Sequence, residues 1–313
     1  MIEGKLAVLF GGGGFLGRHV AERLLQAGAR VRIAQRNPSA ALGVRPLGRL
    51  GQTQLMAASV THAPSVTQAV RGADIVVNLV GVFGETMESV HVDGARIVAE
   101  AAAREGCEAL VHISAIGADS ESAAQYGRTK ARGEAAVMAA FPRATILRPS
   151  VVFGQDDQFT NRFAGLIRAL PVVPVIGADT RLQPVYVRDV AKAVCVAAAD
   201  PARHGGKTFE LGGPQVLSMM ELNRWIARAI ARERHFVEVP GAAAMALAAT
   251  TGWLPGAPIT LDQYRMLERD NKVAESALAL ADLGVTATPL AAVADDWLTP
   301  YRKHGRFGPV AAR

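Results

Sequence analysis

The chain has few cysteines, few aromatic residues and no long hydrophobic run. Of its 313 residues only two are cysteines, Cys107 and Cys195, and both lie in apolar contexts without a nearby cluster of histidines or further cysteines. Such isolated cysteines argue against a zinc site and do not require an oxidising compartment. We therefore expect two buried thiols and no bound metal.

No stretch reaches the roughly 20 apolar residues that cross a membrane as a helix. The first apolar run, residues 6–10, is too short for a signal peptide and leads into a glycine-rich turn. Residues 241–254 (GAAAMALAATTGWL) are apolar but too short to span, and they predict a buried or interfacial helix. We expect a cytoplasmic protein, with a peripheral position on the cytoplasmic face of the inner membrane as a further possibility.

The composition is that of a globular protein with a basic balance. Hydrophobic residues make up 50% of the chain, charged residues 20% and aromatic residues 5%, and the net charge is +6. A positive balance favours anionic partners such as nucleotides, phosphates or anionic lipid. The basic residues are spread along the chain without interleaved aromatics, so we expect no nucleic-acid binding.

Strand and helix patterns alternate through the first half. Short apolar runs are typical of strands that are buried on both faces, and the segments between them have helical spacing. This alternation predicts an α/β fold of the Rossmann type, a doubly wound parallel sheet with ligands at the carboxyl ends of its strands. The predicted strands are 6–10, 31–35, 54–57, 75–80, 110–114 and 145–148, and the predicted helices are 15–27, 64–70, 90–103 and 123–140.

Beyond Pro149 the alternation loosens, and prolines interrupt it. Short strands are predicted at 184–187 and 208–211, and helices at 219–232 and 261–269. We expect a Rossmann domain over 1–152, to which 184–211 return. Residues 153–183 and 212–313 are predicted to form a smaller, interleaved C-terminal domain that holds a substrate or a partner.

A glycine-rich turn follows the first predicted strand. Residues 11–17 read GGGGFLG, in which Gly11, Gly14 and Gly17 have the spacing of a dinucleotide-binding turn between a strand and a helix. One glycine permits the turn, another lets the backbone approach a pyrophosphate, and the last lets helix and strand pack closely. The free N–H groups at the helix start, around Phe15 and Leu16, would face the phosphates.

The end of the second strand favours NADP(H) over NAD(H). NAD-binding turns are usually followed, about 20 residues on, by an acidic residue that binds the ribose 2′-hydroxyl. This chain has no acidic residue at that place. It has Arg36 instead, which could pair with a 2′-phosphate. Arg18, directly after the turn, could reach the same phosphate.

Tyr126 and Lys130 are the candidate catalytic pair. Their spacing of four residues places both side chains on one face of the predicted helix. Lys130 could bind the nicotinamide ribose and lower the pKa of the phenol, and Tyr126 could then act as a general acid or base.

These motifs together resemble the extended or atypical short-chain dehydrogenase/reductase family. The resemblance covers residues 6 to about 214. The matching stretches are GGGGFLGRHV, NLVGVF, VHVDGARIVAEAA, LVHISAIGAD, YGRTKARGE, ILRPSVVFG, QPVYVRDVA and FELGGP. Other stretches resemble a narrower branch, the NADPH-holding accessory subunit of respiratory complex I and its bacterial relatives. They are HISAIGAD, AFPRATILRPSVVFGQDDQFTNRFA, QPVYVRDVA and the ending DLGVTATPL…YRKHGRF.

The resemblance implies roles for further residues. Leu79, Val80 and Gly81 would line the cofactor after the fourth strand. Pro149, Ser150 and Val151 would lie near the nicotinamide carboxamide.

Two positions depart from the family pattern. Active members carry a serine or threonine near the end of the fifth strand, where this chain has Ser114 followed by Ala115. Ser114 could be the catalytic hydroxyl, but in the commoner register Ala115 occupies that place, which leaves open whether the protein is an enzyme. Ser59 stands where many relatives have an aspartate near the adenine.

Other polar residues have structural interpretations. His91, in a predicted helix, and His112, in a buried strand, are expected to be structural. Asp156 and Asp157 are adjacent and do not face each other, so we expect a solvated loop.

Three functions follow from these observations. The first is a peripheral accessory or assembly subunit of respiratory complex I, near an anionic membrane surface, in which NADPH is mainly structural. The second is an active NADP-dependent reductase or epimerase that uses Tyr126 and Lys130 on a nucleotide-sugar or a quinone precursor. The third is a sensor of NADP(H) redox state.

Overall fold

The computed structural model describes residues 2–254, 257 and 259–307. By internal contacts the chain divides into two compact units, each made of segments distant in sequence. The first comprises Met1–Pro149, Val187–Leu211 and Ala274–Thr286, and the second comprises Ser150–Tyr186, Gly212–Val273 and Ala287–Arg313.

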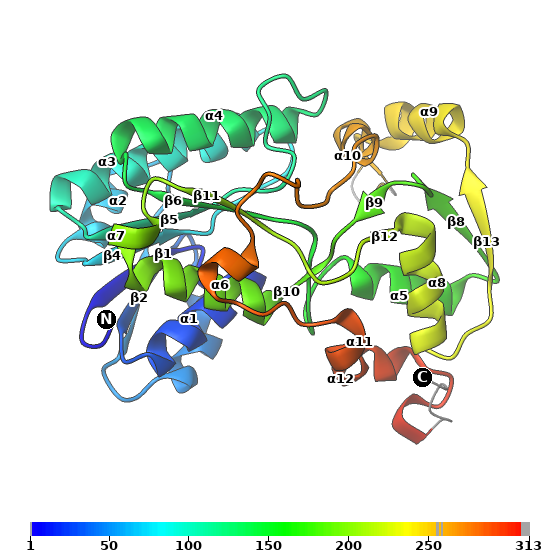
Figure 1. The fold of residues 1–313 in the computed structure, drawn as a ribbon, viewed down its shortest axis with the longest axis horizontal. Helices are drawn as coiled ribbons and strands as arrows, with labels where there is room; N and C mark the ends of the chain where they lie inside the picture. Colours follow the sequence, from blue (N-terminus) through cyan, green and yellow to red (C-terminus); the bar gives the residue numbers. More distant parts are fainter. Residues whose placement is uncertain (1, 255–256, 258, 308–313) are drawn as a thin grey trace. The chain divides into compact units, whose positions relative to one another are not determined.

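A seven-stranded parallel sheet forms the centre of the first unit (Figure 1). The strand order is β11-β6-β5-β4-β1-β2-β3, so successive connections run in opposite directions from β1, as in doubly wound nucleotide-binding folds. The predicted fold class is confirmed. The strands are β1 (Leu6–Phe10), β2 (Arg30–Gln35), β3 (Thr53–Ala57), β4 (Ile75–Asn78), β5 (Ala109–Ile113), β6 (Thr145–Pro149) and β11 (Thr208–Leu211).

Helices cover both faces of this sheet, which explains its continuous apolar strands. Every residue of β1, β4 and β5 is buried. Helices α2 (Ala63–Val70), α3 (Ala95–Glu105) and α4 (Gln125–Ala140) share one hydrophobic core with one face, and α1 (Phe15–Gln26) packs beside α6 (Val187–Ala199) on the other (Figure 1). Strands enclosed in this way cannot alternate polar and apolar residues.

Two elements of the first unit differ from the sequence prediction. The helix predicted at 90–103 begins with a π-helical segment, η2 (Ser89–Gly94), before α3. The unpredicted 3₁₀ helix η1 (Pro38–Leu47) follows β2, and the side chain of Asn37 caps it by accepting from the Ser39 N–H. The other elements of this unit are α7 (Pro201–His204) and η3 (Leu280–Leu283).

The second unit has its own core and, over its described residues, three two-stranded sheets. Helices α5 (Thr160–Ala169) and α8 (Met219–Ala229) pack together over a core that includes Phe153 and Trp297. The sheets pair β7 (Val152–Phe153) with β10 (Val185–Tyr186), β8 (Val172–Ile176) with β13 (His235–Val239), and β9 (Arg181–Leu182) with β12 (Leu217–Ser218). The remaining elements are α9 (Gly241–Thr251), α10 (Leu261–Leu267), α11 (Leu290–Val293), α12 (Asp295–Leu298), η4 (Thr299–Tyr301) and η5 (Gly305–Phe307).

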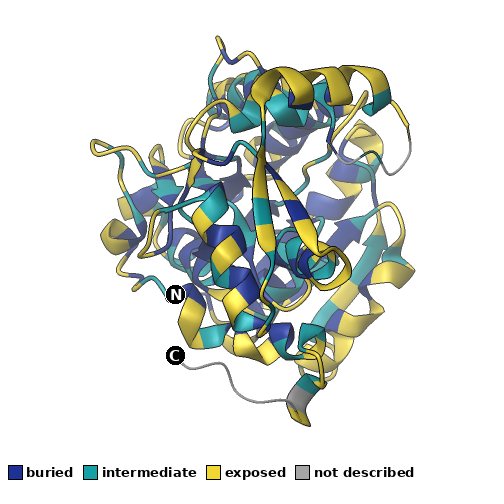
Figure 2. Cartoon of the chain, turned by 90° about the vertical axis from the view of Figure 1, so that its right-hand side faces the viewer, coloured by how far each residue is buried: buried dark blue, intermediate teal, exposed yellow. Residues whose placement is uncertain are grey.

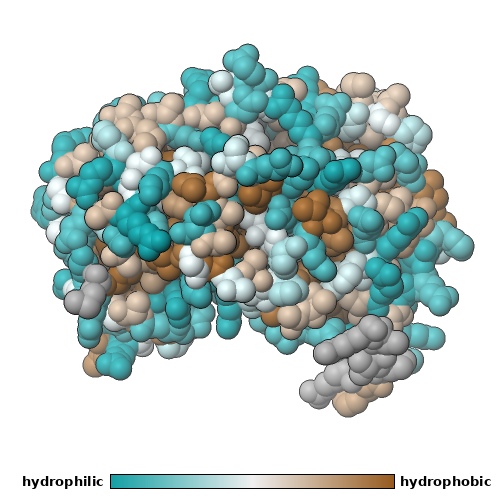
Figure 3. Space-filling view, in the orientation of Figure 1, coloured by the Kyte–Doolittle hydropathy of each residue, from teal (hydrophilic) through white to brown (hydrophobic). Residues whose placement is uncertain are grey.

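Helix α9 is apolar and exposed. Only Ala244 and Ala248, one turn apart, are buried, and both α9 and β13 carry mostly exposed residues (Figure 2). The buried alternative for residues 241–254 is therefore wrong, and the interfacial alternative stays a prediction. On the face drawn in Figure 3, hydrophilic residues prevail and brown residues occur in separate small patches. Among the described residues, no helix combines the length and hydropathy that a membrane crossing requires.

Candidate functional site

The turn after β1 has the geometry of a phosphate cradle. Gly11 has φ +81°, a conformation that favours glycine, and a Cβ atom there would lie 3.3 Å from Val80 Cγ2. A Cβ atom on Gly17 would overlap the carbonyl oxygen of Gly11 and lie 2.6 Å from Gly12 Cα. Helix α1 can therefore approach β1 closely only because position 17 has no side chain.

Within the residues that the structure describes, no side chain caps the N–H groups at the start of helix α1. Gly14 is its extended N-cap residue, and the first turn contains no acidic residue. Phe15 and Leu16 in this turn are half-buried. Unsatisfied N–H groups and the positive end of the helix dipole suit a phosphate group at this point. The glycine cradle and α1 thus fit the pyrophosphate of a dinucleotide.

Gln35, at the end of β2, is a positioning residue that the sequence analysis missed. Its Oε1 accepts a hydrogen bond from the Gly13 N–H at 2.9 Å, and its Nε2 donates to the Asn37 carbonyl at 2.6 Å. The side chain therefore ties the glycine turn to the end of β2. The sequence did offer a signal for this role, because Gln35 lies at the end of the strand where an acidic residue usually binds the adenosine ribose.

The residues that follow β2 and β3 carry positive charge and no carboxylate. Arg36 is exposed, and within the described part of the chain it forms no ion pair. Ser59, just after β3, bonds instead to local groups: its Oγ lies 2.9 Å from Thr61 Oγ1, and its N–H donates to Ser65 Oγ. No carboxylate follows β2 or β3 directly to repel a 2′-phosphate.

Tyr126 and Lys130 lie together in the first turns of α4. The Lys130 Nζ is buried, donates to the Ile113 carbonyl at 3.2 Å and lies 5.8 Å from the centroid of the Tyr126 ring. It would also lie 3.4 Å from a Cβ atom on Gly81. The predicted pair is thus assembled beside the end of β5, with its ammonium next to the loop after β4.

The predicted lowering of the phenol pKa is wrong for this structure. Burial raises the pKa of Tyr126 to about 12, because desolvation disfavours the charged phenolate. Burial also lowers the pKa of Lys130 to about 8, while the carboxylate of Glu134 acts in the opposite direction. Near neutral pH the phenol is therefore protonated and can donate a hydrogen bond.

Phe83 covers the ring of Tyr126 and is a second residue that the sequence analysis did not identify. The two rings are stacked with centroids 4.7 Å apart and planes 18° apart, although 57% of Phe83 is exposed. Phe83 follows Leu79, Val80 and Gly81, which the structure places after β4; Leu79 and Val80 are half-buried and Gly81 is exposed. The loop that was predicted to line the cofactor thus also covers the candidate catalytic phenol.

His91 holds this loop against α4. Its Nε2 accepts the Val82 N–H at 3.0 Å, so its Nδ1 carries the proton and donates to Thr129 Oγ1 at 2.9 Å. Thr129 in turn donates to the Tyr126 carbonyl. Burial and then the charge of Lys130 lower the pKa of His91 to about 3, so the imidazole is neutral at neutral pH.

His112 on β5 is fully enclosed beside Asn78 on β4. Asn78 Oδ1 accepts the Val80 N–H at 3.2 Å, which directs its Nδ2 to the Nδ1 of His112, also at 3.2 Å. Burial lowers the pKa of His112 to about 3, with a further contribution from Lys130. Both histidines thus form buried hydrogen bonds to other side chains, as expected for residues with a structural role.

We expect acid to destabilise the protein through these two histidines. Their folded pKa values lie below the ordinary value near 6.5, so stability is full above pH 6.5 and is lost as the pH falls toward 3. Each should contribute a loss of about 1 kcal/mol per pH unit in that range. Urea unfolding between pH 4 and 7 measures this, and the slope should be shallower in His112→Asn. Equal slopes in the two proteins would contradict the assignment.

Ser114 lies buried at the end of β5. Its N–H donates to the Leu147 carbonyl at 2.8 Å, while its Oγ has no hydrogen-bond partner among the described residues. A buried hydroxyl in this state can still bond to a bound group. Ala115, which follows, is half-buried and offers no hydroxyl.

The predicted carboxamide residues belong to different units. Pro149 ends β6 in the first unit, where its carbonyl accepts the Ile116 N–H. Ser150 and Val151 begin the second unit, where Ser150 Oγ lies 2.6 Å from Asn271 Oδ1 and the Val151 N–H donates to the same oxygen. Asn271, 120 residues further along than Val151, was not identified from the sequence.

The solvated-loop prediction is wrong for Asp157. Asp156 is exposed, but Asp157 is buried in the second unit. Its carboxylate accepts from the N–H groups of Gly154, Phe159 and Thr160 at 2.5–2.9 Å, and from Thr160 Oγ1 at 2.5 Å. It therefore holds the loop that leads into α5.

The cysteines and acidic groups form no metal site in the described ranges. No group of three or more histidine, cysteine, aspartate or glutamate side chains there could hold a metal ion. Cys107 is buried as expected, and Cys195 is only half-buried.

Comparison with known proteins assigns the family. The model of the NAD dependent epimerase/dehydratase family matches residues 7–212. The chain belongs to this family. Its cofactor class is therefore a nicotinamide dinucleotide, which agrees with the glycine cradle and the uncapped α1. The extended short-chain dehydrogenase resemblance is confirmed.

Three further similarities extend this result. The chain is 32% identical to NADH dehydrogenase [ubiquinone] 1 alpha subcomplex subunit 9, mitochondrial, of Arabidopsis thaliana, over 99% of this chain and 82% of that protein. It is 30% identical to a ceramide reductase of Caulobacter vibrioides, over 63% of this chain and 62% of that protein. A nucleoside-diphosphate-sugar epimerase of Staphylococcus aureus shares the fold, with a TM-score of 0.74 at 16% identity over 91% of this chain and 97% of that one.

Proposed function

We propose that this chain is a peripheral accessory or assembly subunit of respiratory complex I (NADH:ubiquinone oxidoreductase), in which bound NADP(H) is mainly structural. The observation that carries the proposal is its 32% identity, over nearly its whole length, to the Arabidopsis subunit. A ligand that binds only the folded state stabilises it by an amount set by its concentration and affinity. A bound dinucleotide would thus stabilise the folded first unit before it assembles with other subunits.

The first unit supplies groups for each part of the nucleotide. Gly11, Gly14 and Gly17 would receive the pyrophosphate, and Arg36 the 2′-phosphate of NADP(H). Lys130 would bind the hydroxyls of the nicotinamide ribose beside Gly81. The nicotinamide itself supplies hydride chemistry when bound.

Two features of Tyr126 support a structural role for the nucleotide. Phe83 is stacked on the phenol ring at 4.7 Å, so one side of the ring is closed to a substrate. The raised pKa of the phenol, about 12, also disfavours the base role that oxidation of an alcohol would need near neutral pH, although it leaves a proton-donor role open. Ala115 offers no second hydroxyl in the register that active relatives use.

The exposed apolar side chains around α9 support a docked position on the cytoplasmic face of the membrane. Met245, Leu247, Trp253 and Leu254 are between 37% and 78% exposed. Exposed apolar groups of this size mark interaction surfaces, and the net charge of +6 would add attraction to anionic lipid.

Purification through an affinity tag on the full chain tests this proposal. Complex I subunits should co-purify from detergent-solubilised membranes, together with NADPH that stays reduced when quinones or carbonyl compounds are added. A protein that is recovered alone and lacks nucleotide would overturn both parts. Recovery with complex I but without nucleotide would overturn only the proposal that NADP(H) has a structural role.

An active NADP-dependent reductase is the second candidate function. The contact between the Lys130 ammonium and the Tyr126 ring favours it, because this pair can bind a ribose and donate a proton to a carbonyl oxygen. Oxidation of bound NADPH by an added substrate, followed as loss of reduced-nicotinamide absorbance, would establish this activity if Tyr126→Phe abolished it.

Arg36 is expected to determine the preference for NADP(H). In Arg36→Asp, a carboxylate would repel the 2′-phosphate and accept from a ribose hydroxyl, so NADPH should bind at least about 10-fold more weakly and NADH more tightly. Calorimetric titration with both nucleotides measures the change. The neighbouring exchange Arg45→Asp on η1 controls for net charge, and an equal loss in both variants would exclude a specific role for Arg36.

A further inference from the structure

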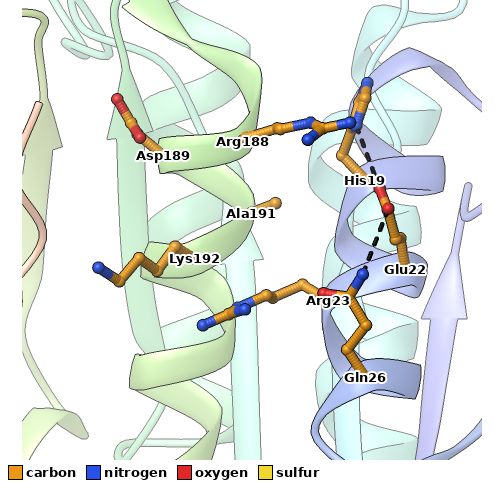
Figure 4. A pocket seen from close by; sticks show the side chains of 8 residues that line it. All are labelled: His19, Glu22, Arg23, Gln26, Arg188, Asp189, Ala191 and Lys192. Carbon is orange, nitrogen blue, oxygen red and sulfur yellow. Dashed lines mark hydrogen bonds and ion pairs between the residues drawn. The ribbon is translucent and has the colours of Figure 1, made fainter. Parts of the chain in front are cut away.

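We propose that the groove between α1 and α6 binds a small, multiply charged phosphate anion, at a site separate from the glycine turn. The groove has a volume of about 330 Å³ and lies wholly within the first unit (Figure 4). It is lined by His19, Glu22, Arg23, Gln26, Arg188, Asp189, Ala191 and Lys192.

One face of each helix forms the groove. His19, Glu22, Arg23 and Gln26 follow the spacing that places side chains on a single face of α1. Arg188, Ala191 and Lys192 do the same on α6. Figure 4 shows Arg188 extending from α6 toward His19, and Arg23 extending from α1 toward α6. The two guanidinium groups thus enter the groove from opposite sides.

Both carboxylates of the groove have partners, whereas three of its basic side chains form no ion pair in the described part of the chain. Glu22 accepts from Gln26 Nε2 at 3.3 Å and lies 3.8 Å from His19 Nδ1. Asp189 is buried and takes part in another interaction. By contrast, no ion pair of Arg23, Arg188 or Lys192 occurs within the described ranges.

The positive field of Arg23 reaches α6. Burial raises the pKa of the half-buried Cys195, one turn beyond Ala191 and Lys192, and the charge of Arg23 acts against that increase. Like charges held near one another without counter-ions raise the affinity for an anion. Two guanidinium groups can each donate paired hydrogen bonds to phosphate oxygens.

The size and lining of the groove indicate a small hydrophilic ligand. Its volume is at the lower end of small-molecule sites, and among the described residues Ala191 is the single apolar one that lines it. An adenine or nicotinamide ring would find no apolar wall there. A diphosphate or triphosphate group matches both the charge and the size. Acidic polypeptides could present similar charge but do not need a groove of this size.

Calorimetric titration of the full chain with pyrophosphate tests the site. Saturating NADPH occupies the glycine turn, so binding that persists in its presence is assigned to a second site. Arg23→Gln/Arg188→Gln should weaken this binding at least about 10-fold and leave NADPH affinity unchanged. The matched control is Arg224→Gln/Arg228→Gln, which removes two exposed arginines from α8 and should bind pyrophosphate like the parent. Thermal unfolding verifies that both variants are folded.

A third variant sharpens the test. Glu22→Gln removes a carboxylate from the groove and should tighten pyrophosphate binding several-fold. The proposal is overturned by an absence of binding, by displacement with NADPH, or by equal affinity in parent and groove variant. It is also overturned if a polyglutamate peptide binds the groove and pyrophosphate does not, because the occupant would then be an acidic protein.

Discussion

The Gly17→Ala variant is expected to lose nucleotide binding by at least about 100-fold. The new Cβ atom would overlap the Gly11 carbonyl oxygen and lie 2.6 Å from Gly12 Cα, so α1 must move away from β1. Its N–H groups would then no longer point at the pyrophosphate, and forced overpacking costs typically 1–3 kcal/mol or more. Calorimetry with NADPH, together with thermal unfolding, measures both effects.

The control for this variant is Gly43→Ala. Gly43 lies in η1 and a Cβ atom there would have no neighbour within 4 Å, so both nucleotide affinity and stability should be unchanged. If Gly17→Ala bound NADPH as the parent does, the turn would not be the phosphate site. If Gly17→Ala is partly unfolded, NADPH titration at a lower temperature, where more of the variant is folded, would separate a binding defect from a folding defect.

The Asp157→Ala variant is expected to lose about 3 kcal/mol of unfolding free energy. The carboxylate accepts four hydrogen bonds at 2.5–2.9 Å in the loop before α5, and its removal would leave buried N–H groups without acceptors. Each such group costs about 1–3 kcal/mol, although relaxation of the loop and water entry reduce the sum. The effect belongs to the second unit, so NADPH affinity of the folded protein should change little.

Tryptophan fluorescence during urea unfolding would follow this loss. The Trp297 indole N–H lies 3.3 Å from Thr160 Oγ1, which itself donates to Asp157, so the indole reports on this loop. Asp156→Ala is the matched control, because that neighbouring carboxylate is exposed and its removal should cost less than about 0.5 kcal/mol. Equal losses in the two variants would show that burial of Asp157 does not stabilise the unit.

The amino-acid sequence by itself determined the architecture and the cofactor class of the first unit. The apolar runs at β1, β4 and β5 predicted strands buried on both faces, and the glycines at 11, 14 and 17 predicted the phosphate turn. The spacing of Tyr126 and Lys130 predicted a shared helix face. These features were accessible because each is local: periodicity, turn chemistry and i,i+4 spacing act within one element.

Only the tertiary structure decided what the side chains between elements do. Gln35 bonds to the glycine turn across 22 residues, His91 to Thr129 across 38, and Ser150 to Asn271 across 121. The burial of Asp157, the stacking of Phe83 on Tyr126 and the groove between α1 and α6 likewise depend on which faces meet. Periodicity shows that an element has an apolar or polar face, but it does not show what covers that face. The hydrogen-bond partner and the burial of each side chain depend on segments that are far away in the sequence.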